Sequence, residues 1–150
     1  MADFFKIRPV VATDFEQWQE LWQIYNKFYG RDDFPAEISK LTWFRFFDDN
    51  EPVHALVAEQ NGVMLGFTHY LFHRSTSRIE LSCYLQDLLV NDTSRGQGVG
   101  RRLIEAVYEQ ARIVGSRRVY WQTHESNATA RKLYDNVAEL SGFIVYAKDL

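Results

Sequence analysis

The sequence predicts a single α+β domain, residues 1–150, built on a mixed β-sheet, and three observations lead to this prediction. A length of 150 residues is usual for one domain with one hydrophobic core. The expected elements run in the order strand, two helices, three strands, helix, strand, helix, strand. Short turns make the three consecutive strands antiparallel, whereas a crossover through a helix makes the strands on its two sides parallel.

A short strand and two helices are expected in the first third of the chain. Residues 4–11 alternate weakly between apolar and polar side chains, which suits a strand. Thr13 and Glu16 have the spacing of a capping box at a helix start, and Gly30 ends this helix. A second helix follows Pro35. Aromatic residues recur along the first helix as on one buried face: Phe15, Trp18, Trp22, Tyr25 and Tyr29.

Three strands, and then alternating helices and strands, are expected in the remainder of the chain. The β-rich runs at residues 53–59 and 63–72 are joined at Asn61-Gly62, a dipeptide that favours the tight turn of a hairpin. The further elements are a strand at 79–90, a helix at 98–114, a strand at 118–123, a helix at 127–140 and a last strand at 142–147.

Composition and charge restrict the class of protein. Hydrophobic residues make up 46% and charged residues 25%, which excludes a disordered or fibrous chain. The net charge of −3 argues against a nucleic-acid partner. No apolar run reaches the ~20 residues of a membrane span, and the first residues show no export signal. Cys83 is the sole cysteine, so no intrachain disulfide forms, and we expect a cytoplasmic protein without a membrane partner.

The most informative stretch lies between the strand ending at Val90 and the helix after it, and it reads Arg95-Gly96-Gln97-Gly98-Val99-Gly100-Arg101-Arg102. Three glycines at alternate positions let a ligand approach the backbone closely, and their amides join the positive end of the helix dipole. Three arginines gather where that dipole disfavours cations, and bound phosphate removes the conflict. The alternative is a flexible turn with solvated arginines. The spacing fits neither a dinucleotide fingerprint nor a Walker loop.

The pattern Arg95-x-x-Gly98-x-Gly100 resembles the acetyl-CoA motif of the GNAT superfamily of N-acetyltransferases. The resemblance extends over Leu85-Gln86-Asp87-Leu88-Leu89-Val90 and Asn127-x-x-Ala130-x-x-Leu133-Tyr134. Tyr25-x-x-Phe28-Tyr29 and Thr42-Trp43-x-Arg45 are similar to the small branch that acetylates histone tails, polyamines or free amino acids. Together these segments imply a GNAT-like fold in which the strands at 79–90 and 118–123 splay apart. They also imply an acetyl-CoA-dependent N-acetyltransferase acting on a small amine or a protein-tail amine.

The resemblance implies how the chain binds acetyl-CoA. The backbone of Leu88, Leu89 and Val90 would pair with the pantetheine arm as with another strand, and an amide near Leu88 would hold the thioester carbonyl. Asn127 would hydrogen-bond the same arm. The alternative for residues 88–90 is a plain buried strand, and the alternative for Asn127 is a helix N-cap. The residues implied to enclose the pyrophosphate are Arg95, Gly96, Gln97, Gly98, Val99, Gly100 and Arg101.

The resemblance also implies two catalytic residues. Tyr134 would protonate the departing thiolate, since a phenol with a pKa near 10 is a reasonable acid for it; core packing is the alternative. Relatives often carry an acidic pair on the fourth strand, and here the pair is Gln86-Asp87, with the first carboxylate missing. Asp87 is the candidate base, with Glu80 or a water chain as substitutes, or Asp87 only holds the cationic substrate. The resemblance also implies that the amine attacks the thioester directly, in a ternary complex of the chain, acetyl-CoA and the amine.

The missing carboxylate at Gln86 leaves a rival function, a CoA-binding sensor or regulatory subunit without turnover. A second rival is an interaction module whose basic turn contacts a phosphorylated or nucleic-acid partner. Gly142-Phe143 lies eight residues after Tyr134, where many relatives place this pair four residues on, and the resemblance implies a homodimer that pairs through the last strand.

The histidines carry no metal motif. No pair of them has zinc-ligand spacing with Cys83, so no metal is expected. His69 and His73 lie four apart and are expected to form a surface pair on one strand face. His124 follows the strand at 118–123 and is a candidate for contact with substrate.

Overall fold

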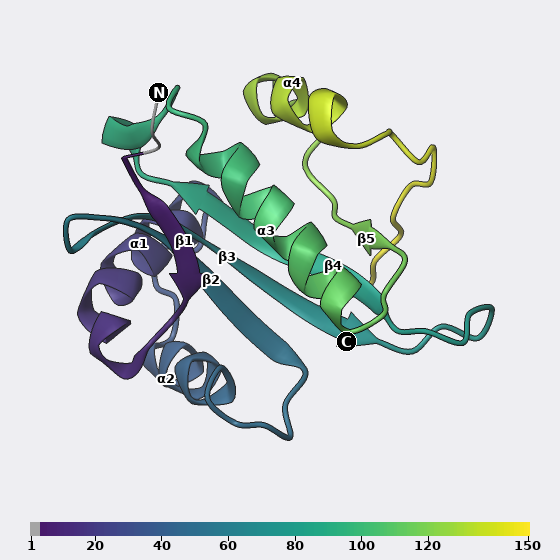
Figure 1. Ribbon diagram of the computed structural model, residues 1–150, viewed down its shortest axis with the longest axis horizontal. Helices are drawn as coiled ribbons and strands as arrows, with labels where there is room; N and C mark the ends of the chain where they lie inside the picture. Colours follow the sequence, from purple (N-terminus) through teal and green to yellow (C-terminus); the bar gives the residue numbers. More distant parts are fainter. Residues whose placement is uncertain (1–3) are drawn as a thin grey trace.

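The structure, a computed structural model, describes residues 4–150 and contains a five-stranded sheet in the order β1-β2-β3-β4-β5 (Figure 1). The first four strands are antiparallel to their neighbours, and β4 and β5 are parallel, as the sequence predicted. The strands are β1 (Lys6–Pro9), β2 (Val53–Gln60), β3 (Val63–His73), β4 (Ser82–Val90) and β5 (Val119–Tyr120).

Helices cover both faces of this sheet (Figure 1). α1 (Phe15–Phe28) and α2 (Ala36–Arg45) lie on one face, and α3 (Val99–Ile113) lies on the other, while α4 (Ala128–Val137) follows β5. Two short 3₁₀ turns, η1 (Ala12–Asp14) and η2 (Asp92–Ser94), precede α1 and α3. The helix order and the crossover from β4 through α3 to β5 agree with the sequence prediction.

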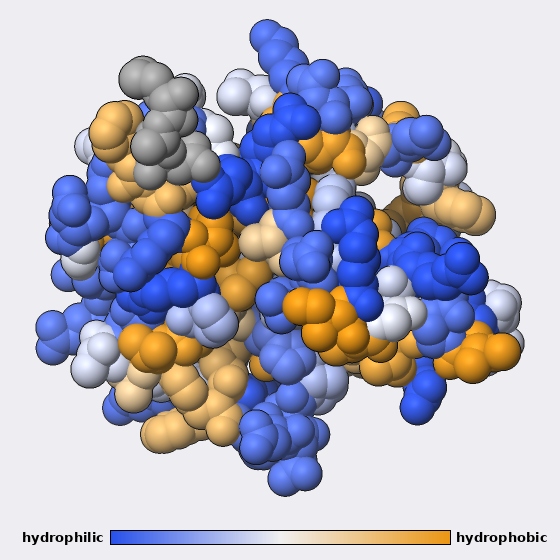
Figure 2. Space-filling view, viewed as in Figure 1, coloured by the Kyte–Doolittle hydropathy of each residue, from blue (hydrophilic) through white to orange (hydrophobic). Residues whose placement is uncertain are grey.

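Each face of the sheet has its own hydrophobic core. The core under α3 contains its inward face, where Leu103, Ile104 and Val107 are completely buried. The core under α1 and α2 is aromatic and centres on Trp18 and Phe67. The outward side of α3 lies on the face shown in Figure 2, which is largely hydrophilic. α3 is therefore an ordinary amphipathic helix, and its polar first turn is available at the surface.

The start of α1 differs from the prediction. The helix begins at Phe15, and Thr13 lies in the preceding 3₁₀ turn without capping the helix. The cause is Asp14, whose carboxylate accepts the Val11 amide at 2.8 Å and both terminal nitrogens of Arg8 at 2.7 and 2.9 Å. This buried carboxylate sets the turn in place of the predicted capping box. The hairpin prediction is confirmed, with positive φ at Asn61-Gly62.

The last predicted strand is wrong: residues 138–150 contain no helix or strand. A strand requires a neighbouring strand edge, and β5 has only two residues. α4 also ends at Val137, earlier than predicted, and the chain beyond it is exposed. Its apolar residues are therefore left on the surface: Leu140, Phe143, Ile144, Val145 and Tyr146.

β4 carries two irregularities that shape the site. His69 of β3 faces Asp87, whereas the next residue, Tyr70, faces Leu85, so Gln86 is the extra residue of a β-bulge. β5 pairs only with the first part of β4, through Cys83 and its neighbour. Within residues 4–150, the edge of β4 from residue 85 onward therefore has no strand on the β5 side. This divergence is the predicted splay, and it also shortens β5.

Among the described residues, no helix combines the length and the apolar composition that crossing a membrane requires.

Candidate active site

The glycine-rich turn forms a helix start whose amides are uncapped. Gly96 and Gly98 have φ near +80°, a left-handed conformation that glycine adopts without strain. Gly98 is the N-cap of α3, it provides no side-chain cap, and no acidic residue lies in the first turn. The first amides of a helix have no partner within the helix, and the dipole adds positive potential there. The turn therefore fits an anion such as a diphosphate.

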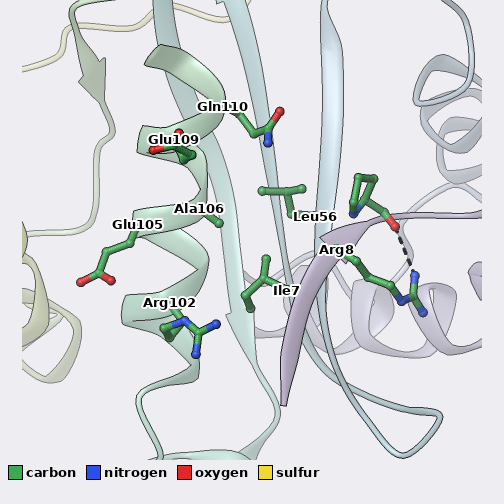
Figure 3. Close-up of a pocket in the computed structure, with 9 residues that line it drawn as sticks. Ile7, Arg8, Leu56, Arg102, Glu105, Ala106, Glu109 and Gln110 are labelled. Atoms are coloured by element: carbon green, nitrogen blue, oxygen red, sulfur yellow. Dashed lines mark hydrogen bonds between the residues drawn. The ribbon is translucent and has the colours of Figure 1, made fainter. Parts of the chain in front are cut away.

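The three arginines of this stretch do not act alike. Arg95 pairs with Asp92 at 3.0 Å and Arg101 pairs with Glu105 at 2.8 Å, both at the surface. Such exposed ion pairs are weak, so a phosphate can replace their carboxylates at little cost. Arg102 instead extends towards β1, with its guanidinium 5.2 Å from the ring centre of Phe5 (Figure 3). The sequence grouped it with the other two, but it lines a separate groove of about 330 Å³ between β1 and α3.

The open edge of β4 leads to this turn. Leu88, Leu89 and Val90 are half-buried, with Leu88 and Val90 packed towards α3 and Leu89 packed towards α1. A Cβ atom at Gly100 would lie 3.3 Å from a methyl of Leu133 and 3.5 Å from one of Val90. Glycine at this position therefore allows α3, α4 and β4 to meet closely. The contact fixes the glycine-rich turn at the end of the open strand edge.

α4 brings Asn127 and Tyr134 to the same region. Asn127 is the N-cap residue by position, but its side chain donates to the Thr123 hydroxyl at 3.3 Å and does not cap the helix. The Tyr134 ring packs edge-on against Trp121, with centres 5.4 Å apart. Burial, and then the neighbouring Tyr29, raise the pKa of Tyr134 to about 12. The phenol is protonated at neutral pH, and no hydrogen bond among residues 4–150 uses its hydroxyl.

Asp87 lies at the bulge, 9% exposed, in a chain of hydrogen bonds that the sequence did not reveal. Its Oδ2 is 2.9 Å from Nδ1 of His69, and the indole N–H of Trp18 donates to Nε2 of that histidine at 2.9 Å. An indole nitrogen can only donate, so Nε2 must accept and the ring proton must sit on Nδ1. His69 is therefore a neutral imidazole that donates to the Asp87 carboxylate.

Tyrosines connect Asp87 with Tyr134. Burial, and then the charge of Asp87, raise the pKa of Tyr25 and also that of Tyr84. The ring centres of Tyr25 and Tyr29 lie 4.9 Å apart, and Tyr29 is the residue that, after burial, raises the pKa of Tyr134. The structure thus brings the predicted carboxylate on β4 and the predicted phenol on α4 into one region, lined by Tyr25 of α1 and by Tyr29, which directly follows that helix. Carboxylates and aromatic faces both attract ammonium groups.

Two expectations about neighbouring residues are corrected. Glu80 precedes β4, seven residues before Asp87, which is ~20 Å along an extended chain, and it pairs with Arg78. It therefore does not converge on the site. His69 and His73 do not form a surface pair, because His69 is 3% exposed and His73 bonds the Tyr120 hydroxyl at 2.7 Å. The alternation of Phe67 and His69 on one face was the signal for burial. His124 is exposed and bonds to Ser126.

An uncapped helix start at the end of an open strand edge, with a carboxylate and a phenol near by, suits an enzyme that binds a phosphate-bearing cosubstrate. The family model "Acetyltransferase (GNAT) family" matches residues 18–138. The D-amino-acid N-acetyltransferase HPA3 of Saccharomyces cerevisiae is 34% identical over 149 residues, which cover 98% of this chain and 92% of that protein. The chain belongs to the GNAT family and is an acetyl-CoA-dependent N-acetyltransferase.

Other relatives agree with this assignment. The uncharacterized N-acetyltransferase YhfO of Bacillus subtilis is 29% identical over 138 residues, covering 91% of this chain and 87% of that protein. The structure of the aminoglycoside N-acetyltransferase AAC(6′)-Iy in complex with CoA superposes with a TM-score of 0.84 at 18% identity, over 99% of this chain and 97% of that one. That likeness confirms the fold.

Proposed function

We propose that the chain transfers the acetyl group of acetyl-CoA to a primary amine by direct attack in a ternary complex. The observation that carries the proposal is the position of Asp87 and Tyr134 around Tyr25 and Tyr29, beside the open edge of β4. The amine enters from the side of α1, and the thioester lies along β4. No covalent enzyme intermediate is needed, and Cys83, whose pKa burial raises to about 12, is a poor nucleophile.

The proposed cosubstrate site combines the uncapped amides of residues 96–101 with the open strand edge. The diphosphate binds at the start of α3, where Arg95 and Arg101 exchange their surface carboxylates for phosphate oxygens. The backbone of residues 88–90 pairs with the pantetheine arm, and Asn127 hydrogen-bonds that arm. Bound acetyl-CoA supplies the activated acyl group, and the chain supplies orientation and proton transfer.

The proposed reaction needs one base and one acid. An alkyl ammonium has a pKa near 10.4, so at neutral pH only about one molecule in a few thousand has a free electron pair. Asp87 accepts the ammonium proton, and the amine nitrogen then forms the new bond to the thioester carbon. An amide near Leu88 stabilises the negative charge on the carbonyl oxygen. The C–S bond breaks, and the Tyr134 hydroxyl gives its proton to the departing sulfur. The nitrogen loses its second proton, which restores the Tyr134 phenol, and Asp87 releases its proton to solvent, so that a neutral amide and a free thiol leave.

His69 acts in this scheme as a positioning residue. As a neutral donor it fixes one oxygen of Asp87. Trp18 determines which nitrogen of His69 carries the proton. Gln86 occupies the bulge and is exposed. The carboxylate that relatives carry at this position is missing here, but Asp87, the carboxylate that faces the tyrosines, is present. This arrangement favours turnover over the sensor function.

The test is thiol release from acetyl-CoA over a panel of amines that includes D- and L-amino acids, polyamines, histone-tail peptides and aminoglycosides. Asp87→Asn should lower kcat/KM by about a hundredfold for the best amine, because a positioned base is lost. Gln86→Ala, at the exposed bulge, is the matched control and should leave it unchanged. Tight binding of acetyl-CoA without thiol release for any amine would contradict the proposal and indicate a sensor.

A homodimer is part of the proposal. Phe143, Ile144, Val145 and Tyr146 form an apolar segment that is exposed in the single chain. A second copy supplies the strand edge that the segment lacks, as the family resemblance implied. Sedimentation should therefore give a dimer, and Ile144→Asp should shift it towards the monomer. A monomeric wild-type protein at micromolar concentration would refute this part of the proposal.

A further inference from the structure

The C-terminal turn of α1 holds one arginine in a fixed position. Gly30, with φ +76°, reverses the chain, so that the Arg31 amide donates back to the carbonyl of Asn26 at 2.8 Å. Nε of Arg31 donates to the side-chain oxygen of the same asparagine, also at 2.8 Å. Asn26 is 1% exposed and is itself anchored to the Trp22 carbonyl at 2.9 Å. A buried amide thus orients a guanidinium whose own side chain is exposed.

Aromatic rings restrict the guanidinium further. Its central carbon lies 6.0, 5.6 and 5.8 Å from the ring centres of Tyr25, Tyr29 and Phe34. Within residues 4–150 the hydrogen bond of this guanidinium uses Nε, and it forms no ion pair there, although Asp32 follows it in the chain. The two terminal nitrogens therefore present a planar pair of donors, which matches a carboxylate.

The position of Arg31 relates it to the reaction. The Arg31 guanidinium lies over the rings of Tyr25 and Tyr29. After burial, the charge of Asp87 raises the pKa of Tyr25, and Tyr29 raises the pKa of Tyr134. Arg31 is thus one aromatic ring away from the proposed base and one from the proposed acid. A fixed positive group and a fixed negative group in one region complement a molecule that carries both charges.

We propose that Arg31 binds the carboxylate of the acceptor, so that the acceptor is an α-amino acid or another amine with a carboxylate close to it. The acceptor's ammonium group faces Asp87 while its carboxylate forms two parallel hydrogen bonds with Arg31. This inference rests on the proposed function and adds to it the residue that selects the substrate class. Polyamines and aminoglycosides, which lack a carboxylate, gain nothing from this contact.

The experiment compares matched substrates in matched variants. Phenylalanine and leucine, as both enantiomers, are each paired with the corresponding decarboxylated amine, and kcat and KM are measured for wild type, Arg31→Gln and Lys40→Gln. Lys40 is an exposed cation of α2, and its variant controls for the loss of one positive charge. Arg31→Gln should raise KM for the amino acids about ten- to a hundredfold, leave kcat nearly constant and change the decarboxylated amines less than about twofold.

Three results would overturn the inference. The first is an equal loss for an amino acid and its decarboxylated amine. The second is an equal effect of Lys40→Gln, and the third is a raised KM for acetyl-CoA, which would assign the guanidinium to a phosphate of the cosubstrate. Calorimetry of N-acetylphenylalanine against wild type and Arg31→Gln gives a readout that does not depend on turnover. A wild type that acetylates no amine but loses this binding on Arg31→Gln would contradict the proposed function while showing that Arg31 binds a carboxylate.

Discussion

Replacing Tyr134 by phenylalanine tests the proposed proton donor with little disturbance of the structure. The ring packs edge-on against Trp121 and contributes to the core under α3. Phenylalanine keeps these contacts and removes only the hydroxyl, which no hydrogen bond among residues 4–150 uses. The stability of the fold should therefore change by no more than about 0.5 kcal/mol. Any large effect on turnover then belongs to the chemistry.

The expected magnitude follows from what the hydroxyl does. A hydrogen bond to a group that gains charge contributes about 1.5–3 kcal/mol, which is about ten- to a hundredfold in rate. Loss of the whole proton transfer extends this to about a thousandfold. Burial raises the pKa of Tyr134 to about 12, so the phenol stays protonated well above neutral pH, and it can serve as an acid throughout that range. The loss should therefore appear in kcat at every pH between about 6 and about 10.

Thiol release under saturating acetyl-CoA and amine measures kcat, and calorimetry measures the affinity for acetyl-CoA. Tyr134→Phe should lower kcat about ten- to a thousandfold and leave the affinity unchanged. Tyr108→Phe is the control, because its hydroxyl donates to the Val137 carbonyl at 2.8 Å, at the opposite end of α4 from Asn127. That variant should lose about 1 kcal/mol of stability and keep its kcat. An unchanged kcat in Tyr134→Phe would remove this residue from the reaction.

Three further predictions concern the fold and the carboxylate. Arg8 lowers the pKa of Asp14 from its ordinary value near 3.8, so the stabilisation is complete above that value and is lost as the pH falls through the lowered one. Chemical denaturation should show Asp14→Asn about 2 kcal/mol less stable at pH 7, with the difference shrinking as the pH falls below about 3.8; a difference that does not depend on pH would refute the ion pair. A Cβ at Gly66 would lie 2.4 Å from the Leu89 carbonyl oxygen, so Gly66→Ala must displace β4. It should cost about 1–3 kcal/mol and raise KM for acetyl-CoA, and normal values for both would contradict the close approach. Nitrogen NMR of the His69 ring should place its proton on Nδ1, and His69→Phe should lower kcat/KM at least about tenfold while His73→Phe does not; a proton on Nε2 would exclude the hydrogen bond from Trp18.

The sequence was sufficient for features that depend on local chemistry. The Asn61-Gly62 hairpin requires positive φ at two successive residues, and few residue pairs other than this one allow it. Gly96 and Gly98 were identified as a backbone that approaches a ligand, and both adopt the left-handed conformation. The amphipathic α3 follows from its own periodicity. In each case the residues that determine the structure are neighbours in the chain.

Features that depend on pairing between distant segments could not be read from the sequence. The hydrogen bond between His69 and Asp87 depends on the register of β3 and β4, which the bulge at Gln86 shifts by one residue. The run at 142–147 has the residues of a strand, but a strand forms only where another edge is available. Nothing in the sequence singles out Arg31, because the role proposed for it depends on how Gly30 folds the chain back over α1.

A crystal structure of the chain with bound coenzyme A would show directly whether the start of α3 holds the diphosphate. Diphosphate oxygens should lie within about 3 Å of the amides at the start of α3, the pantetheine arm along residues 88–90 and the sulfur beside the Tyr134 hydroxyl. A coenzyme whose diphosphate lies elsewhere, for example in the groove between β1 and α3, would contradict the proposed cosubstrate site.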